Sequence, residues 1–444
     1  MKINAHLDLD LVALETQDRI TLMLDLTAPT SDAASERPGQ AVQVVLDRSG
    51  SMDGAPLAAA IESISKLVDR LAPQDSFGLV AFDDHSLIIA PHRKMSDHHI
   101  PTLKQAIREI RSGGSTDISS GYLLGLRELT QSKNTAGSTL LLISDGHANA
   151  GEQDPKKLEQ IASTSASNSI TTSTIGLGNG YDEMILSALS RGGGGQHRFA
   201  ATIDEAIGAI AAEVNDLLEK SAINAILKVT PVPGLTGVPA IELLQQLPYW
   251  KEGDTYVVQL GDFYAGENRR FMIDLEVPGM AALGLATVAT VTLDYLNLAD
   301  MTDFSVVLPI QVNVVPDDIA QGRTANTVVR AERMVLRAQS EKALATEELH
   351  SGRVKDAAQR LKSAATNLRK EAADISATDE QSSETLRIIR AEADEMERLA
   401  TFAEHEDAQF AIKRNIESFS ANTRSRKIRT EENINLKNEG DELQ

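Results

Sequence analysis

The sequence predicts a multidomain protein in which a doubly wound, Rossmann-like α/β domain is inserted into an all-β sandwich and followed by a C-terminal α-helical region. Three observations predict this arrangement. Apolar residues alternate with polar ones in residues 1–38 and again in residues 220–316, as they do in half-buried strands. Short continuous apolar runs alternate with helical patterns in residues 40–219. Residues 318–420 are rich in Ala, Glu, Lys, Arg and Leu.

The N-terminal segment, residues 1–38, predicts two strands. Apolar residues occupy every second position between residues 3 and 11, and again between residues 20 and 26. Because an isolated hairpin is only marginally stable, we expect both strands to join those of residues 220–316. The polar residues 30–40 would form a linker, and the α/β domain would be an insertion whose ends lie close together.

The α/β domain is predicted from the alternation of strands and helices along residues 40–219. Buried strands are expected at 41–47, 76–82, 138–144, 170–176 and 196–200. Helices are expected near 56–71, 97–111, 118–131, 155–167, 182–190 and 203–219. Alternation of this kind predicts a mostly parallel sheet with helices on both faces.

The second half of the chain predicts the rest of the sandwich and then helices. Strands are expected near 222–230, 241–247, 255–261, 271–277, 285–295 and 306–314. Helices fit 323–348, 352–374 and 380–418, and they either pack on the sandwich as a bundle or present an α-hairpin to a partner. Residues 421–444 are expected to form a mobile polar tail. Its basic cluster is either an anion-binding patch or a run of solvated charges, and comprises Arg424, Arg426, Lys427 and Arg429.

Composition excludes several classes of function. With 64 acidic and 43 basic residues, the formal net charge of −21 disfavours binding to nucleic acid or to an anionic membrane. The chain has no cysteine, which excludes disulfides, zinc–thiolate sites and iron–sulfur clusters and suits a reducing compartment. The first residues lack the apolar stretch of a signal peptide, and no apolar run approaches the roughly 18 residues of a membrane span. We therefore expect a cytoplasmic protein with no membrane insertion.

Oxygen-bearing side chains gather at the predicted strand ends of the α/β domain. The first strand ends at Asp47, and Ser49 and Ser51 follow in a D-x-S-x-S turn. Thr116 precedes the helix expected at 118–131, and Asp145 follows the strand expected at 138–144. Because ligands bind at the carboxyl ends of strands in such sheets, we expect these side chains to share one edge. The alternative is that they only cap helices and turns.

This set of ligands predicts a site for a divalent cation, preferably Mg²⁺. Carboxylate and hydroxyl oxygens are hard ligands of the kind that Mg²⁺ prefers, and Ca²⁺ or Mn²⁺ could substitute. Two carboxylates and three neutral hydroxyls leave a coordination position and do not fully neutralise the cation. A carboxylate from another protein could take that position.

These residues resemble the von Willebrand factor A family and its metal-ion-dependent adhesion site, a D-x-S-x-S motif followed by a Thr and then an Asp on separate loops. The resemblance covers residues 40–219 and assigns the metal ligands to Asp47, Ser49, Ser51, Thr116 and Asp145. The flanking regions resemble integrin β chains, in which an A domain interrupts a β-sandwich, and more loosely inter-α-trypsin inhibitor heavy chains. Those proteins are extracellular. Without cysteine or an export signal, this sequence is more similar to intracellular bacterial A-domain proteins, so no adhesion role is implied.

The favoured function is a non-enzymatic, metal-dependent protein-binding module whose cation accepts an Asp or Glu carboxylate from a protein partner. A first alternative is an adaptor subunit for a separate AAA+ ATPase of the MoxR or chelatase type, because this chain has no P-loop of its own. A second is a structural protein with a vestigial site. A third is a metal-dependent hydrolase, although no base is indicated beside Ser49 or Ser51.

Overall fold

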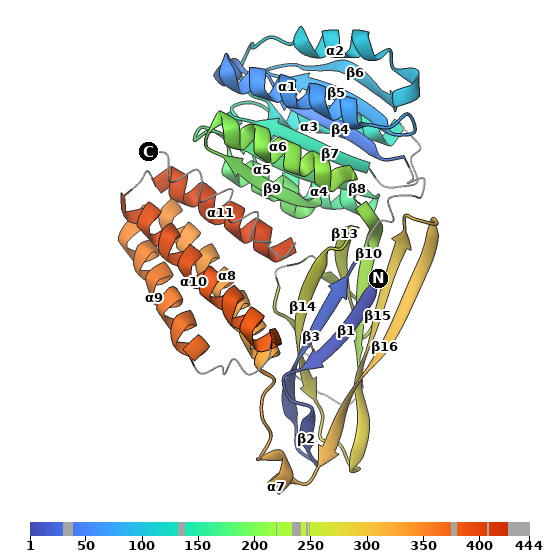
Figure 1. Ribbon diagram of the computed structural model, residues 1–444, viewed down its shortest axis with the longest axis vertical. Coiled ribbons are helices and arrows are strands. Elements are labelled where there is room, and N and C mark those ends of the chain that lie inside the picture. Colours follow the sequence, from blue (N-terminus) through green and yellow to red (C-terminus); the bar gives the residue numbers. More distant parts are fainter. Residues whose placement is uncertain are drawn as a thin grey trace.

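The protein is described by a computed structural model that covers residues 1–29, 39–131, 138–218, 220–232, 241–245, 247, 249–373, 380–405 and 408–424. Figure 1 shows an α/β body at the top, a body of two sheets below it, and a helical body beside both. Within the described ranges, no helix is long and apolar enough to cross a membrane.

The α/β body is built on a six-stranded sheet in the order β6-β5-β4-β7-β8-β9, parallel except for β6. Its strands are β4 (Ala41–Asp47), β5 (Ser76–Phe82), β6 (Ser86–Lys94), β7 (Ser138–Ser144), β8 (Ile170–Leu177) and β9 (Gly194–Ala200). Its helices are α1 (Ala55–Arg70), α2 (Ile100–Arg108), α3 (Ile118–Gln131), α4 (Pro155–Ser167), α5 (Glu183–Gly192) and α6 (Ile203–Leu218). Every residue of β4, β5, β7 and β8 is buried, which explains their continuous apolar sequences. The predicted α/β fold is confirmed.

Helix α3 approaches the sheet closely because two of its residues are glycines. A Cβ atom at Gly121 would lie 2.5 Å from the Phe82 ring, and one at Gly125 would lie 2.5 Å from Val45. Asp117 caps the start of this helix, where its Oδ1 accepts a hydrogen bond from the Ser120 backbone NH at 2.9 Å. The close packing therefore fixes the loop that carries Thr116 beside the strand ends.

The α/β body differs from the prediction in two places. Strand β6 was not predicted, and the helix expected at 97–111 is the shorter α2. Strand β6 lies at the sheet edge, pairs only with β5, and exposes Leu87 and Ile88. An edge strand with a proline and exposed apolar residues lacks the alternation that predicts a strand.

The two-sheet body contains strands from both sides of the α/β body. One sheet has the order β1-β3-β14-β11 and the other β12-β13-β10-β15-β16-β2. These strands are β1 (Lys2–Leu7), β2 (Leu11–Ala13), β3 (Asp18–Thr27), β10 (Lys220–Pro231), β11 (Ile241–Leu243), β12 (Tyr249–Glu252), β13 (Thr255–Tyr264), β14 (Asn268–Val277), β15 (Gly284–Asn297) and β16 (Thr302–Val315). Strand β3 pairs with both β1 and β14, so the N-terminal segment is integral to this body.

The N-terminal run expected as one strand over residues 3–11 is in fact two strands in different sheets. Strand β1 pairs antiparallel with β3, whereas β2 pairs in parallel with β16. Between them, the Asp8 carboxylate accepts hydrogen bonds from the backbone NH groups of Leu9 (2.8 Å) and Thr21 (2.6 Å). These side-chain bonds, with the bond from the Asp8 NH to the Thr21 carbonyl at 2.9 Å, hold the chain where it crosses from one sheet to the other.

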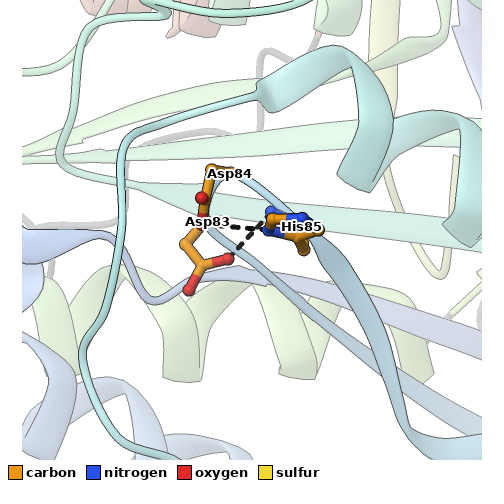
Figure 2. Close-up of side chains that lie close together, drawn as sticks. All are labelled: Asp83, Asp84 and His85. Carbon is orange, nitrogen blue, oxygen red and sulfur yellow. Dashed lines mark hydrogen bonds and ion pairs between the residues drawn. The ribbon is translucent and has the colours of Figure 1, made fainter.

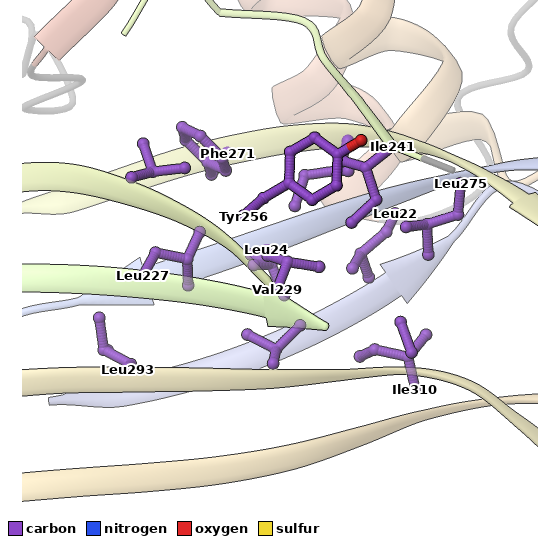
Figure 3. Close-up of a cluster of buried hydrophobic side chains, with 14 of the residues drawn as sticks. Leu22, Leu24, Leu227, Val229, Ile241, Tyr256, Phe271, Leu275, Leu293 and Ile310 are labelled. Atoms are coloured by element: carbon purple, nitrogen blue, oxygen red, sulfur yellow. The ribbon is translucent and has the colours of Figure 1, made fainter. Parts of the chain in front are cut away.

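One hydrophobic core is shared by the two sheets (Figure 3). The N-terminal strand β3 contributes Leu22 and Leu24, and strands encoded after the α/β body contribute Leu227, Phe271 and Leu293. The core therefore forms only when segments separated by the whole α/β body come together.

A buried ion pair joins the base of the α/β body to the two-sheet body. The Lys220 ammonium donates to Asp262 Oδ2 at 2.6 Å and to Thr139 Oγ1, at the start of β7, at 2.7 Å. Burial alone would raise the pKa of Asp262, but the adjacent Lys220 charge and the hydrogen bonds hold it below its ordinary value.

The helical body contains α7 (Asp317–Ala320), α8 (Thr327–His350), α9 (Val354–Ala373), α10 (Glu380–His405) and α11 (Ala408–Arg424). Helices α8 to α11 share a core, and α8 is anchored to β14 by ion pairs of Arg270 with Glu332 (3.2 Å) and of Arg333 with Asp274 (2.8 Å). This body lies beside the two-sheet body and reaches the α/β body through α11 (Figure 1).

The helix expected over residues 380–418 is in fact two helices, α10 and α11, and the second runs past the expected boundary at residue 420 to Arg424. The sequence between His405 and Ala408 contains neither Gly nor Pro, and α11 packs on β9. The rest of the expected tail, including Arg426, Lys427 and Arg429, lies outside the described residues.

Replacing Leu24 with Ala should lower the free energy of unfolding of the two-sheet body by about 2–5 kcal/mol, because it removes a fully buried side chain from the shared core. Leu285→Ala, at a residue that is 70% exposed, should change it by less than about 0.5 kcal/mol. Urea denaturation followed by the fluorescence of Trp250, the only tryptophan, measures both. Equal small effects would show that β3 does not help to hold this core together.

Candidate metal centre

The carboxyl ends of the parallel strands meet at one edge of the α/β body, which we call the rim. It comprises the loops that follow β4, β5, β7 and β8 and the loop that precedes α3. Strand β4 is paired with β5 on one side and with β7 on the other. The chain leaves β4 toward β5 and later returns to the opposite side at β7, so a topological switch point lies there, where α/β sheets bind ligands.

Asp47 is the last residue of β4 and is fully buried at the rim. One carboxylate oxygen accepts a hydrogen bond from the Ser49 backbone NH at 2.7 Å, and the other accepts one from the Ser144 hydroxyl at 2.5 Å. Ser144 ends the neighbouring strand β7. Two adjacent strand ends therefore fix the orientation of this carboxylate.

The two serines of the turn lead from Asp47 to Asp145. A short 3₁₀ turn over Gly50–Met52 follows β4 and places the Ser49 and Ser51 hydroxyl oxygens 3.1 Å apart. The Ser51 hydroxyl donates to Asp145 Oδ1 at 2.7 Å. Four of the five predicted ligands thus form one connected set, although 94 residues separate Ser51 from Asp145.

Thr116 completes the set from a third loop. A Cβ atom at Gly146 would lie 2.8 Å from Thr116 Oγ1 and 3.3 Å from Ser51 Oγ, so both hydroxyls approach the backbone beside Asp145. The position of Thr116 is fixed by Asn149, which accepts from the Thr116 NH at 2.9 Å and donates its own NH to the Thr116 carbonyl at 3.1 Å. The structure therefore brings all five predicted residues together.

The two carboxyl groups of this cluster are held in an environment that disfavours their negative charge. Burial raises the pKa of Asp47, despite hydrogen bonds from Ser144 and Ser49 that oppose the shift. Burial, together with the charge of Asp47, raises the pKa of Asp145 to about 6, although the Ser51 hydroxyl partly offsets this. A cation between the two carboxylates would remove this penalty.

The donor set fits a hard divalent cation. Its atoms are carboxylate and hydroxyl oxygens, and Asp47, Ser49, Thr116 and Asp145 are buried whereas Ser51 is exposed. The exposed side of Ser51 gives the cluster an opening to solvent, which a metal site that also binds a ligand requires.

A second group at the rim, Asp83, Asp84 and His85, also has metal-ligating side chains within 4.8 Å of one another (Figure 2). Its members already have protein partners. Asp83 Oδ2 lies 2.6 Å from the Arg48 guanidinium, Asp83 Oδ1 accepts from the His85 NH at 2.9 Å, and His85 Nδ1 lies 3.3 Å from Asp84 Oδ1. The ion pair with Arg48 already neutralises the buried member of this group, so it fits a cation less well than the five-residue cluster.

Sequence reasoning missed three residues that act on the cluster: Asp83, Ser144 and Asn149. Asp83 directly follows β5 and its charge contributes to raising the pKa of Asp47. Asp83 and Ser144 lie at strand ends, so the rule that selected Asp47 could have found them. Nothing in the sequence indicated Asn149, because its role depends on a contact between two loops.

Comparison with known proteins identifies the α/β body. Residues 42–213 match the model of the von Willebrand factor type A domain. An uncharacterised Synechocystis protein is 25% identical over 251 residues, covering 54% of this chain and 59% of its own length. The uncharacterised Escherichia coli protein YfbK is 30% identical over 206 residues, covering 46% of this chain and 35% of its own length. The chain thus spans between a third and three fifths of these relatives.

Two solved structures resemble the chain over nearly its whole length. A von Willebrand factor type A protein from Catenulispora acidiphila covers 95% of this chain and 96% of its own, with 16% identity and a TM-score of 0.71. The ArnB paralog VWA2 from Sulfolobus acidocaldarius covers 95% of this chain and 98% of its own, with 15% identity and a TM-score of 0.62. At these identities the likeness is one of fold. Together with the family match, it shows that this chain contains a von Willebrand factor type A domain.

Proposed function

We propose that the chain is a divalent-cation-dependent protein-binding module. In this proposal a cation, preferably Mg²⁺, is held by Asp47, Ser49, Ser51, Thr116 and Asp145. An Asp or Glu carboxylate of a protein partner takes the remaining coordination position. The observation that supports it is the gathering of these side chains from three separate loops: Ser49, Ser51 and Asp145 are linked by hydrogen bonds, and the Ser51 and Thr116 hydroxyls both approach Gly146.

The charges of the cluster suit this role. Two buried carboxylates repel each other and would repel a third from a partner, so binding of an acidic partner requires the cation. The hydroxyls are neutral and leave the cation short of full neutralisation. Oxygen ligands also suit Ca²⁺ and Mn²⁺, so those ions should substitute for Mg²⁺.

We also propose that the role of the chain is binding and not catalysis. The Ser51 hydroxyl donates to Asp145, and the Ser49 hydroxyl bonds to that of Ser51. In this proposal both serines and Asp145 are ligands of the cation, so neither hydroxyl serves as a nucleophile. The absence of cysteine agrees with a cytoplasmic location. The high net negative charge agrees with a protein partner rather than a nucleic acid.

Replacing Asp47 with Asn should weaken the binding of Mn²⁺ or Mg²⁺ by more than about 100-fold, because it removes a charged ligand. Loss of a residue that only hydrogen-bonds to a ligand typically weakens metal binding by roughly 10- to 100-fold. Asp84→Asn, in the neighbouring Asp83–His85 group, is the matched control and should leave the affinity unchanged. Isothermal titration of each variant measures this. The reverse pattern would assign the cation to the neighbouring group and refute the proposed ligand set.

The affinity for the cation should fall as the pH is lowered. Because the pKa of Asp145 is raised to about 6, a proton competes with the cation for this carboxylate below that pH. The apparent dissociation constant should rise about tenfold per pH unit for each bound proton. Titrations with Mn²⁺ between about pH 7.5 and about pH 5 test this, and an affinity that stays constant over that range would contradict it.

The stability of the cation-free protein should change with pH in the opposite direction to the affinity, falling as the pH rises. A pKa raised in the folded state means that the contribution of Asp145 to stability is fully present below about pH 4 and is lost as the pH rises through about 6. Asp145→Asn should remove this contribution, which denaturation in EDTA measures.

Partner binding should require both the cation and its ligands. Wild type and Asp47→Ala serve as baits in a cell lysate, each in Mg²⁺ and in EDTA. We expect at least one protein that wild type captures only in Mg²⁺ and that Asp47→Ala does not capture in either condition. Partners that bind equally in all four samples would indicate a surface other than the rim.

A further inference from the structure

The C-terminal helix α11 inserts a lysine into the α/β body. The Lys413 side chain is fully buried, and its ammonium donates to Glu183 Oε2 at 2.7 Å and to the Tyr181 carbonyl at 3.0 Å. It also lies 4.3 Å from the centre of the Tyr181 ring. Glu183 is itself buried at the start of α5, 230 residues earlier in the chain. Such a pair holds its two elements in one geometry, because separating them would leave a buried charge unpaired.

The segment held by Lys413 is part of the rim. It lies between the end of β8 at Leu177 and the start of α5, and Asp182 stands between the two residues that Lys413 contacts. The Asp182 backbone NH donates to the Gly146 carbonyl at 3.3 Å. A Cβ atom at Gly180 would lie 3.1 Å from the Asp145 carbonyl oxygen. The loop that Lys413 fixes is therefore packed directly against the loop of a predicted metal ligand.

Further contacts determine where α11 lies. Arg414 pairs with Glu205, at the start of α6, at 2.9 Å. On the other side of α11, the Lys342 ammonium of α8 donates to Ser418 Oγ at 2.9 Å. Helix α11 is thus bonded to both the helical body and the rim, and it lies between them in Figure 1.

We propose that Lys413 is a positioning residue for the metal site, so that the affinity for the cation depends on the docking of α11. This inference rests on the proposed function. Lys413 fixes the segment from Tyr181 to Glu183, and Asp182 in turn supports the backbone beside Asp145. A carboxylate ligand binds best when it is held in place before the cation arrives. Because such coupling is reciprocal, cation binding should also strengthen the docking of α11.

The test uses the full chain and Mn²⁺ alone. Lys413→Met should raise the dissociation constant for Mn²⁺ about tenfold or more, within the range typical of coupled sites. The paired variant Lys413→Met/Glu183→Gln removes both charges. It leaves no unpaired buried charge, so it should be more stable than Lys413→Met alone. Its affinity should remain weakened, because methionine cannot donate to the Tyr181 carbonyl.

The matched control is Lys220→Met/Asp262→Asn. It removes an equally buried ion pair that lies at the base of the α/β body, at the end of the strands opposite the rim. It should leave the affinity for Mn²⁺ unchanged. Hydrogen exchange supplies a second measurement. Mn²⁺ should slow exchange at the Asp182 amide and along α11 in wild type, and should have no such effect in Asp47→Asn.

The outcomes separate this inference from the proposed function. If wild type binds Mn²⁺ and the Lys413 variants bind it as tightly, the proposed function stands and the role of Lys413 is refuted. If the Lys220 control weakens binding as much as the Lys413 variants do, Lys413 is only structural and the inference fails. If wild type does not bind Mn²⁺, both fail.

Discussion

The proximity of two buried carboxyl groups, Asp47 and Asp145, is the constraint on which the rim depends. Strands β4 and β7 are neighbours in the sheet, so the residues that end and follow them must lie close together. Burial raises the pKa of both carboxyl groups, so the fold disfavours their negative charge. Hydrogen-bond donors offset part of this cost. The Ser144 and Ser51 hydroxyls and the Ser49 backbone NH supply those hydrogen bonds, and a divalent cation would supply the missing positive charge.

The α/β body is attached to the rest of the chain at both ends of its strands, each time by a buried lysine. Lys220 and Asp262 join its base to the two-sheet body, and Lys413 joins its rim to the helical body. Both lysines lie outside residues 42–213, the part that matches the von Willebrand factor type A domain. The bodies on either side therefore place buried, charged side chains against the interior of this domain.

Much of the α/β body could be predicted from sequence because its signals are local. Strands such as β4 and β7 are continuous apolar runs, and helices such as α3 and α4 show clear apolar periodicity, so their predicted bounds agree with the structure. The D-x-S-x-S turn and Asp145 were found in the same way, since each directly follows a buried strand. Their placement at one rim follows from the parallel sheet.

The remaining features depend on contacts between distant segments, which a single sequence does not display. Strand β6 is an edge strand without alternation, and the crossing between β1 and β2 depends on hydrogen bonds from the backbones of Leu9 and Thr21 to Asp8. No Gly or Pro separates the sequences of α10 and α11, and the packing of α11 on β9 is a contact between distant segments. For the same reason nothing in the sequence distinguished Lys413 from the other basic residues of the predicted C-terminal helices.

The most direct test of this account is the position of a cation in crystals of the full chain grown with Mn²⁺, located by its anomalous scattering. The account places a single strong peak within coordination distance of Asp47, Ser51 and Asp145. A peak among Asp83, Asp84 and His85, or no peak at the rim at saturating Mn²⁺, would contradict it.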